Sequence, residues 1–377
     1  MIFVKGDELK VGMRLAKPIY SKDGVLLYER DSKLSQQGID SIDNFGLIGI
    51  FVLEPAEPVP PMTRDDLKFE RFQTMTVFSI QEELNKIIQT KRSHKIQIIA
   101  ANIIKNYGNR NSKINFVQNL RSQDDYVYKH SLNVSILCAM ISHAMNIRLN
   151  EQLDAVITAV IHDIGRVMLN PTEQVDAELM EALAYARGIE IIEHAFANNP
   201  TIKRICMQTH KAIEDCKKGK QTDQSVMVAA KILLVAETYD RMTAMHLGGD
   251  PASEVAAMRL LFDHPECYEK QVVKGLLDSI NILNPGACIE LNNGEKSVVL
   301  VSNPKDILRP MILNFQDNMI IDLSNQMMYG DLHIKDIMKT MDNRYVMDME
   351  ILKQRGIRVN GWHGGEEEEV EEYVPGQ

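Results

Sequence analysis

Residues 157–167 read ITAVIHDIGRV and place a polar pair, His162 and Asp163, at the end of an apolar run. The apolar positions 157, 160, 161 and 164 recur at helical spacing, which predicts an amphipathic helix over 153–165 with Gly165 as its C-terminal stop. Burying an imidazole and a carboxylate without partners is expensive. The pair therefore needs partners in the core, and a metal ion is one candidate. The alternative is structural, because a single helical histidine is usually a satisfied core or surface residue.

The composition is that of an ordinary soluble globular protein. The chain has 377 residues, of which 45% are hydrophobic and 25% charged. No run reaches the ~18 apolar residues of a membrane span, and the first residues lack the basic and apolar regions of a signal peptide. The five cysteines are scattered without a C-x-x-C pair, which favours a reducing compartment. We therefore expect a cytoplasmic protein.

Negative charge is concentrated in one terminal segment. Residues 364–377, GGEEEEVEEYVPGQ, contain six glutamates and no basic residue. The net charge of the chain is −10, so the rest of the chain carries −4. A like-charge run of this kind is typical of a solvated, disordered end. No basic stripe is visible, which argues against binding of duplex nucleic acid. A small anionic ligand, held by a few local cations or a metal, remains compatible with this charge.

The periodicity changes along the chain and predicts a mainly α protein in five parts. Alternating apolar residues and the hairpin turn KDG, with Gly24 at positive φ, indicate a small β-rich N-terminal domain. Four prolines in EPAEPVPPM indicate an extended linker, and a long helical region follows. After it, strands around NNGE form a β-rich C-terminal extension. The expected ranges are 1–54 for the N-terminal domain, 55–66 for the linker, 67–284 for the helical bundle, 285–348 for the extension and 349–377 for the acidic tail.

Imidazoles and acids fall on several apolar helices of the middle region. The candidates are His130, His162, Asp163, His194, His210 and Glu237. A helix bundle can bring such groups from separate helices to one point. Mixed nitrogen and oxygen ligation favours iron, manganese or zinc over calcium and magnesium. We expect one or two divalent ions, with iron or manganese preferred to zinc, and such ions clamp the oxygens of a phosphoryl group.

Three motifs resemble the HD superfamily of metal-dependent phosphohydrolases, and more narrowly its HD-GYP branch, an HD-type helical bundle. They are YVYKHSLNVS (126–135), AVIHDIGRV (159–167) and LLVAETYDRM (233–242). The resemblance implies hydrolysis of cyclic di-GMP, with His130, His162, Asp163 and Glu237 at one metal and Asp163, His194 and His210 at a second. It also implies that Asp163 bridges the ions and that Arg166 steadies the developing phosphoryl charge.

The chain departs from that family at several positions. Residues 209–221, THKAIEDCKKGKQ, stand where the family has H-H-E-x-x-D-G-x-G-Y-P, so the GYP loop is missing. Thr209 replaces a ligand histidine, and Lys211 replaces a glutamate. Glu237 replaces an aspartate and lengthens the reach by a methylene, while His246 stands near the position of a phosphate-contacting arginine. Residues that can ligate a metal are thus retained at every position of the first metal site, whereas the second site has lost a ligand histidine.

Two functions follow from these residues. The first is a metal-dependent phosphodiesterase or phosphohydrolase acting on cyclic di-GMP or another phosphoester. The second is a protein of cyclic di-GMP signalling that binds a cyclic dinucleotide, a protein partner or a second copy of itself on a decayed active site. The loss of a ligand, the recognition loop and phosphate contacts together favours binding over efficient hydrolysis.

Overall fold

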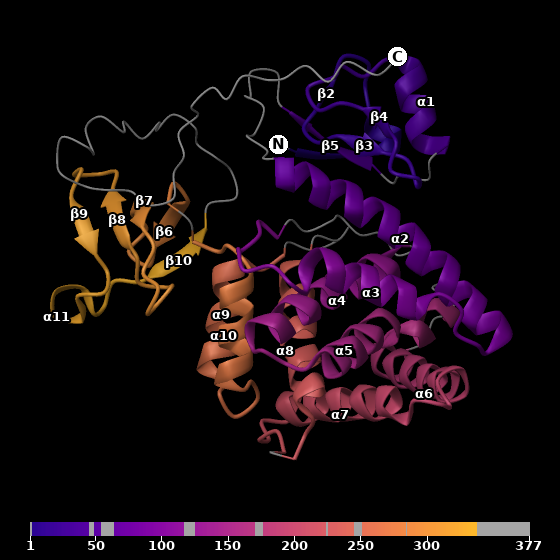
Figure 1. Ribbon diagram of the computed structural model, residues 1–377. Helices are drawn as coiled ribbons and strands as arrows, with labels where there is room; N and C mark the ends of the chain where they lie inside the picture. Colours follow the sequence, from indigo (N-terminus) through magenta and orange to yellow (C-terminus); the bar gives the residue numbers. More distant parts are fainter. Residues whose placement is uncertain are drawn as a thin grey trace. The chain divides into compact units, whose positions relative to one another are not determined.

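The computed structural model describes residues 2–44, 49–53, 64–116, 125–169, 176–223, 225–244, 251–283 and 285–337. The chain divides into two compact units, Met1–Asn281 and Ile282–Gln377. The architecture is mainly α with small β-sheets towards both ends, which confirms the predicted fold class (Figure 1). The acidic tail, His246 and most of the proline-rich linker lie outside the described residues.

The first unit begins with short strands and one helix. The bounds are β1 (Ile2–Lys5), η1 (Gly6–Glu8), β2 (Arg14–Leu15), β3 (Ile19–Tyr20), β4 (Leu26–Tyr28), α1 (Gln36–Asn44) and β5 (Gly49–Leu53). One sheet has the order β1-β5-β2, and β3 and β4 form a separate hairpin. Gly24 in its turn has φ +76°, which confirms the prediction from KDG. The Nζ of Lys17 joins this part to the following helix through Glu70 Oε1 at 2.7 Å.

The rest of the first unit is helical. The helices are α2 (Arg64–Thr90), α3 (Ile96–Tyr107), α4 (Tyr126–Ala144), α5 (Leu149–Ile161), η2 (Ile164–Met168), α6 (Ala177–Ala195), α7 (Pro200–Lys217), α8 (Val228–Thr243), α9 (Glu254–Asp263) and α10 (Lys270–Ser279). Helix α4 packs on α3, α5, α8 and α10, and every residue from 130 to 142 is buried. A helix that is covered all round belongs at the centre of its bundle. Any polar group on it therefore needs a partner within the protein.

The predicted helix over 153–165 ends earlier than expected. Helix α5 stops at Ile161, His162 caps it, and Gly165 lies inside the following 3₁₀ segment η2, so the prediction of Gly165 as a stop is wrong. The glycine serves close packing instead. A Cβ built there would lie 1.9 Å from the Ala184 carbonyl oxygen and 2.6 Å from the Gly188 nitrogen. Only a residue without a side chain lets η2 lie this close to α6.

The second unit is a five-stranded antiparallel sheet with the order β10-β6-β7-β8-β9. Its elements are β6 (Cys288–Leu291), β7 (Lys296–Val301), β8 (Met311–Asn314), β9 (Ile320–Asp322), α11 (Gln326–Tyr329) and β10 (Ile334–Ile337). Gly294 in the β6–β7 turn has φ +85°, which confirms the hairpin predicted from NNGE. None of the helices in the described ranges is long and apolar enough to cross a lipid bilayer.

Candidate metal centre

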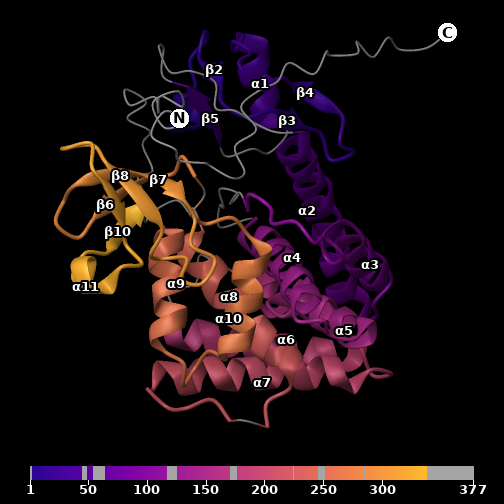
Figure 2. The same ribbon diagram turned by 60° about the vertical axis from the view of Figure 1, so that its left-hand side comes forward.

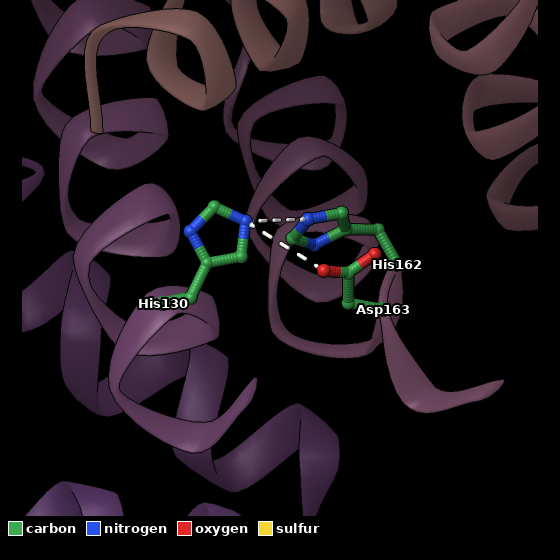
Figure 3. Close-up of side chains that lie close together, drawn as sticks. All are labelled: His130, His162 and Asp163. Carbon is green, nitrogen blue, oxygen red and sulfur yellow. Dashed lines mark hydrogen bonds and ion pairs between the residues drawn. The ribbon is translucent and has the colours of Figure 1, made fainter. Parts of the chain in front are cut away.

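Two histidines from neighbouring helices face one another in the bundle. His130 lies on α4 and is fully buried, and His162 caps the end of α5. Their Nε2 atoms are 3.2 Å apart, and both lie close to Glu237 Oε2 on α8, at 2.8 Å from His130 and 2.9 Å from His162. Figure 3 shows the two rings together with Asp163, whose Oδ2 is 3.9 Å from His130 Nε2. Four residues from three separate segments of the sequence thus lie close together.

The hydrogen bonds on the other ring nitrogens fix which nitrogen faces the centre. His130 Nδ1 lies 2.6 Å from Asp240 Oδ2, and His162 Nδ1 lies 2.8 Å from the Ala159 carbonyl oxygen. Both partners are acceptors, so both Nδ1 atoms carry a hydrogen, and each ring in its neutral form turns an Nε2 lone pair inward. This is the arrangement that outer partners impose on metal-ligating histidines.

The donor set fits a divalent cation. Two imidazole nitrogens and a carboxylate oxygen meet within 2.8–3.2 Å, so either a proton or a metal ion is needed among them. Ligand atoms held about 2.0–2.1 Å from one tetrahedral ion lie about 3.4 Å from one another. The spacings of 3.2 Å between the two imidazole nitrogens and 3.9 Å between His130 and Asp163 are close to this value. Within the part of the chain that the structure describes, His130, His162 and Asp163 form the one group of three or more such ligands with converging atoms.

Without a metal, protons and arginines balance the negative charge. Burial lowers the pKa of His162, but the Glu237 and Asp163 carboxylates outweigh it and raise this pKa to about 9. The pKa of Asp163 is raised by burial but lowered overall by His162, Arg241 and Arg166. The pKa of Glu237 also lies well below its ordinary value, because Arg241 and the two histidines outweigh burial. Both carboxylates are therefore charged near neutral pH.

Two arginines bind the carboxylates of the centre. Arg241 Nε bonds Glu237 Oε1, the oxygen turned away from the histidines, and Arg241 Nη2 lies 3.4 Å from Asp163 Oδ2. Arg166 Nε lies 3.1 Å from the same Asp163 oxygen, and its Nη2 donates to Glu181 at 2.9 Å. Both guanidinium groups line a cavity of about 560 Å³ that also reaches His162, Asp163 and Glu237. The cavity is within the size range of small-molecule sites.

Of the residues expected at a second metal, Asp163 lies in this cluster, whereas His194 and His210 do not join it. His194 is exposed, its Nδ1 bonds the Glu190 carbonyl oxygen at 2.8 Å, and it does not line the cavity. His210 lines the cavity but stacks on Tyr185 with ring centroids 3.6 Å apart. The hydroxyl of Thr209 donates to the Ile205 and Ala230 carbonyl oxygens, at 3.0 and 3.3 Å. These positions supply no second set of converging donors among the described residues.

The sequence motifs predicted four residues of the cluster, but they gave no role to two further residues, Asp240 and Arg241. Both lie in ETYDRM, three and four residues after Glu237. That spacing places them one helical turn from a suspected ligand, which is a usable signal. The signal did not tell whether an arginine at this position faces solvent or the centre, because that depends on the rotation of α8 within the bundle.

Comparisons with known proteins give one distant relative. Cyclic di-GMP phosphodiesterase PA4108 of Pseudomonas aeruginosa is 22% identical over 207 residues, which are 52% of this chain and 49% of that protein. The chain therefore spans about half the length of this relative. No family model and no solved structure matches the chain. The activity named for the relative is consistent with the resemblance to the HD-GYP group that the motifs indicate.

Proposed function

We propose that this protein binds one divalent cation and a phosphate-bearing ligand beside it, and that it acts in cyclic di-GMP signalling by binding rather than by efficient hydrolysis. One observation carries the proposal. The inward Nε2 atoms of His130 and His162 meet one oxygen of Glu237, while Arg241 holds the other oxygen of the same carboxylate. The Oε2 side of this carboxylate suits a metal cation, whereas the Oε1 side is already paired with the guanidinium of Arg241.

The cation would be held by His130, His162, Asp163 and Glu237. Two imidazoles and two carboxylates suit iron or manganese and also accept zinc. When bound, such an ion supplies Lewis-acid polarisation of a phosphoryl oxygen. The protein's own part is to keep both histidines in one tautomer through Asp240 and Ala159, and to keep the carboxylates charged.

Weak hydrolysis follows from the residues at the expected second site. A two-ion clamp needs a second group of ligands that converge on Asp163, and Thr209 offers only a neutral hydroxyl that is bound to backbone oxygens. Arg166 and Arg241 contribute positive charge without Lewis acidity. Their planar donors suit a phosphate held in place.

The ligand proposed is a cyclic dinucleotide. The cavity joins the centre and its two arginines to apolar walls from Leu233, Leu234 and Leu260, which suits a ligand with both phosphate and base surfaces. The distant relative is a cyclic di-GMP phosphodiesterase, and this supports the choice. We propose that a protein partner or a second copy of the chain senses whether the nucleotide is bound. The scattered free cysteines support a cytoplasmic setting.

A second candidate is a single-metal phosphohydrolase. It is favoured by Asp163, which lines the cavity, is 13% exposed, and pairs with Arg166 at the edge of the donor cluster. In that case Asp163 and Arg166 are the catalytic residues, with Arg166 stabilising the negative charge on the phosphoryl oxygens.

Three measurements on one preparation test the proposal. Protein loaded with manganese is analysed for bound metal, titrated with cyclic di-GMP by calorimetry, and incubated with the same nucleotide. We expect about one ion per chain, measurable binding and no multiple turnover. Two ions with multiple turnover would establish the enzyme instead, and absence of nucleotide binding would refute the binding function.

A further inference from the structure

A second hollow lies on α7, beside the cavity of the metal centre. Its volume is about 510 Å³, and its polar lining comes from Lys203, Arg204, Gln208, His210 and Lys211 of α7 together with Tyr185 of α6. Positions 204, 208 and 211 lie on one helical face, and 203, 207 and 211 on the face beside it. Figure 2 shows α7 and α6 next to each other at the lower edge of the bundle, consistent with their packing contacts.

The polar groups of this hollow are mainly donors. Among the described residues, neither Arg204 nor Lys211 forms an ion pair, whereas Lys203 binds Glu193 at 2.7 Å at the margin. The oxygen of Gln208 accepts from the Met227 amide at 2.9 Å, so the NH₂ of Gln208 remains as a donor. None of the residues that line the hollow is acidic, although the chain as a whole carries −10. Concentrated positive charge in an acidic protein selects an anion.

The helix itself adds to this field. Helix α7 begins at Pro200, which also lines the hollow, and Lys203 and Arg204 lie in its first turns. The amino end of a helix of this length carries a partial positive charge that favours phosphate groups. The positive side chains and the partial positive charge at the helix end therefore both attract an anion.

The hollow and the cavity of the metal centre share a wall. Tyr185 and His210 line both of them, and their stacked rings, with centroids 3.6 Å apart, form that wall. A cyclic dinucleotide carries two phosphodiesters on one macrocycle, so a ligand with one of them at the centre can turn the other toward the adjoining hollow. A mononucleotide has one such group and can use only one of the two hollows at a time.

We infer that the hollow lined by Lys203, Arg204 and Lys211 is a phosphate subsite for the distal phosphodiester of a nucleotide bound at the metal centre. The inference rests on the proposed function, since it extends the same ligand across the wall of Tyr185 and His210. Arg204 supplies a planar fork for two phosphate oxygens, and Lys211 supplies a mobile ammonium beside it.

Charge reversal tests the subsite. The variant R204E/K211E is compared with K86E/K105E, which makes the same charge change at exposed lysines of α2 and α3. The milder R204Q/K211Q serves as a second variant should the reversal disturb folding, and circular dichroism checks all of them. Each manganese-loaded protein is titrated calorimetrically with cyclic di-GMP and separately with GMP.

We expect the Kd for cyclic di-GMP to rise about tenfold or more in R204E/K211E, since two charge-assisted contacts are replaced by repulsion. The control should stay within about twofold, and bound metal should be unchanged in both variants. Equal Kd values for the wild type, R204E/K211E and R204Q/K211Q would overturn the subsite and leave the proposed function standing. If the wild type binds GMP but not cyclic di-GMP, and R204E/K211E loses GMP, the hollow binds a single phosphate, and both the distal-phosphodiester subsite and the proposed ligand are wrong. A wild type that binds neither probe refutes both.

Discussion

Asp240 Oδ2 lies 2.6 Å from His130 Nδ1, and neither side chain is exposed to solvent. The carboxylate fixes the hydrogen on Nδ1 and holds the ring so that Nε2 points to Glu237 and His162. A buried acid on α8 thereby sets the tautomer and orientation of a buried imidazole on α4. The centre depends on this outer contact as much as on its inner residues.

Removing this contact should weaken both metal binding and the fold. We expect Asp240→Ala to reduce manganese affinity about 10–100-fold and to lower the free energy of unfolding by about 3 kcal/mol, because a buried imidazole loses its charged partner. Asp240→Asn keeps an acceptor oxygen and should lose less manganese affinity and less unfolding free energy than Asp240→Ala. Calorimetric metal titration and urea unfolding with a chelator measure the two effects, and an Asp240→Ala protein with wild-type affinity would contradict the role given to this residue.

Arg241 should oppose the metal that the neighbouring residues attract. Its guanidinium binds Glu237 and lies 3.4 Å from Asp163, so Arg241→Gln removes a positive charge next to the proposed cation. We expect manganese affinity to rise about tenfold, and the metal-free protein to lose stability because two carboxylates lose a counter-ion. Arg148→Gln is the matched control, since Arg148 pairs with Glu151 on an exposed surface. An unchanged or weaker affinity in Arg241→Gln would show that this arginine does not compete with the metal.

The stability of the metal-free protein should depend on His162. Its pKa is raised from 6.5 to about 9, so the folded state binds this proton more tightly than the unfolded state. The contribution of this proton to the free energy of unfolding is complete below pH 6.5 and is lost as the pH rises towards 9. It amounts to at most about 3 kcal/mol. Urea unfolding in chelator between pH 6 and pH 9.5 measures this loss. His162→Gln should remove the downward slope, and a wild type whose stability stays level across this window would contradict the assignment.

Much of the fold could be predicted because the relevant signals are local. Helical spacing located α5, and turn glycines located two hairpins. The cluster of His130, His162, Asp163 and Glu237 could be proposed from motif order, although the role of these residues as metal ligands stays a prediction. The rotation of each helix could not be predicted. It turns Arg241 toward Asp163 and leaves His194 exposed, and it follows from packing between helices.

Gly165 illustrates a residue whose role only packing reveals. An alanine there would place its Cβ 1.9 Å from the Ala184 carbonyl oxygen, so η2 and α6 must move apart. We expect Gly165→Ala to cost about 3 kcal/mol of unfolding free energy and to weaken metal binding, because Asp163 lies at the start of η2. Gly188→Ala, whose Cβ would meet the Gly165 nitrogen at 3.3 Å, should cost less. Equal stability of the two variants would show that η2 accommodates a methyl group.

Thr209 gives the strongest test of a lost second metal site. Its side chain is 4% exposed and lines the same cavity as Asp163 and His210. An imidazole at this position can enter the cavity, and Thr209→His should raise the number of manganese ions bound per chain after equilibrium dialysis. Thr209→Val removes the hydroxyl without adding a ligand and should leave the number unchanged. If Thr209→His gains metal only when combined with Arg241→Gln, the arginine blocks the second ion. If neither protein exceeds the wild type, the second site has been assigned to the wrong residues.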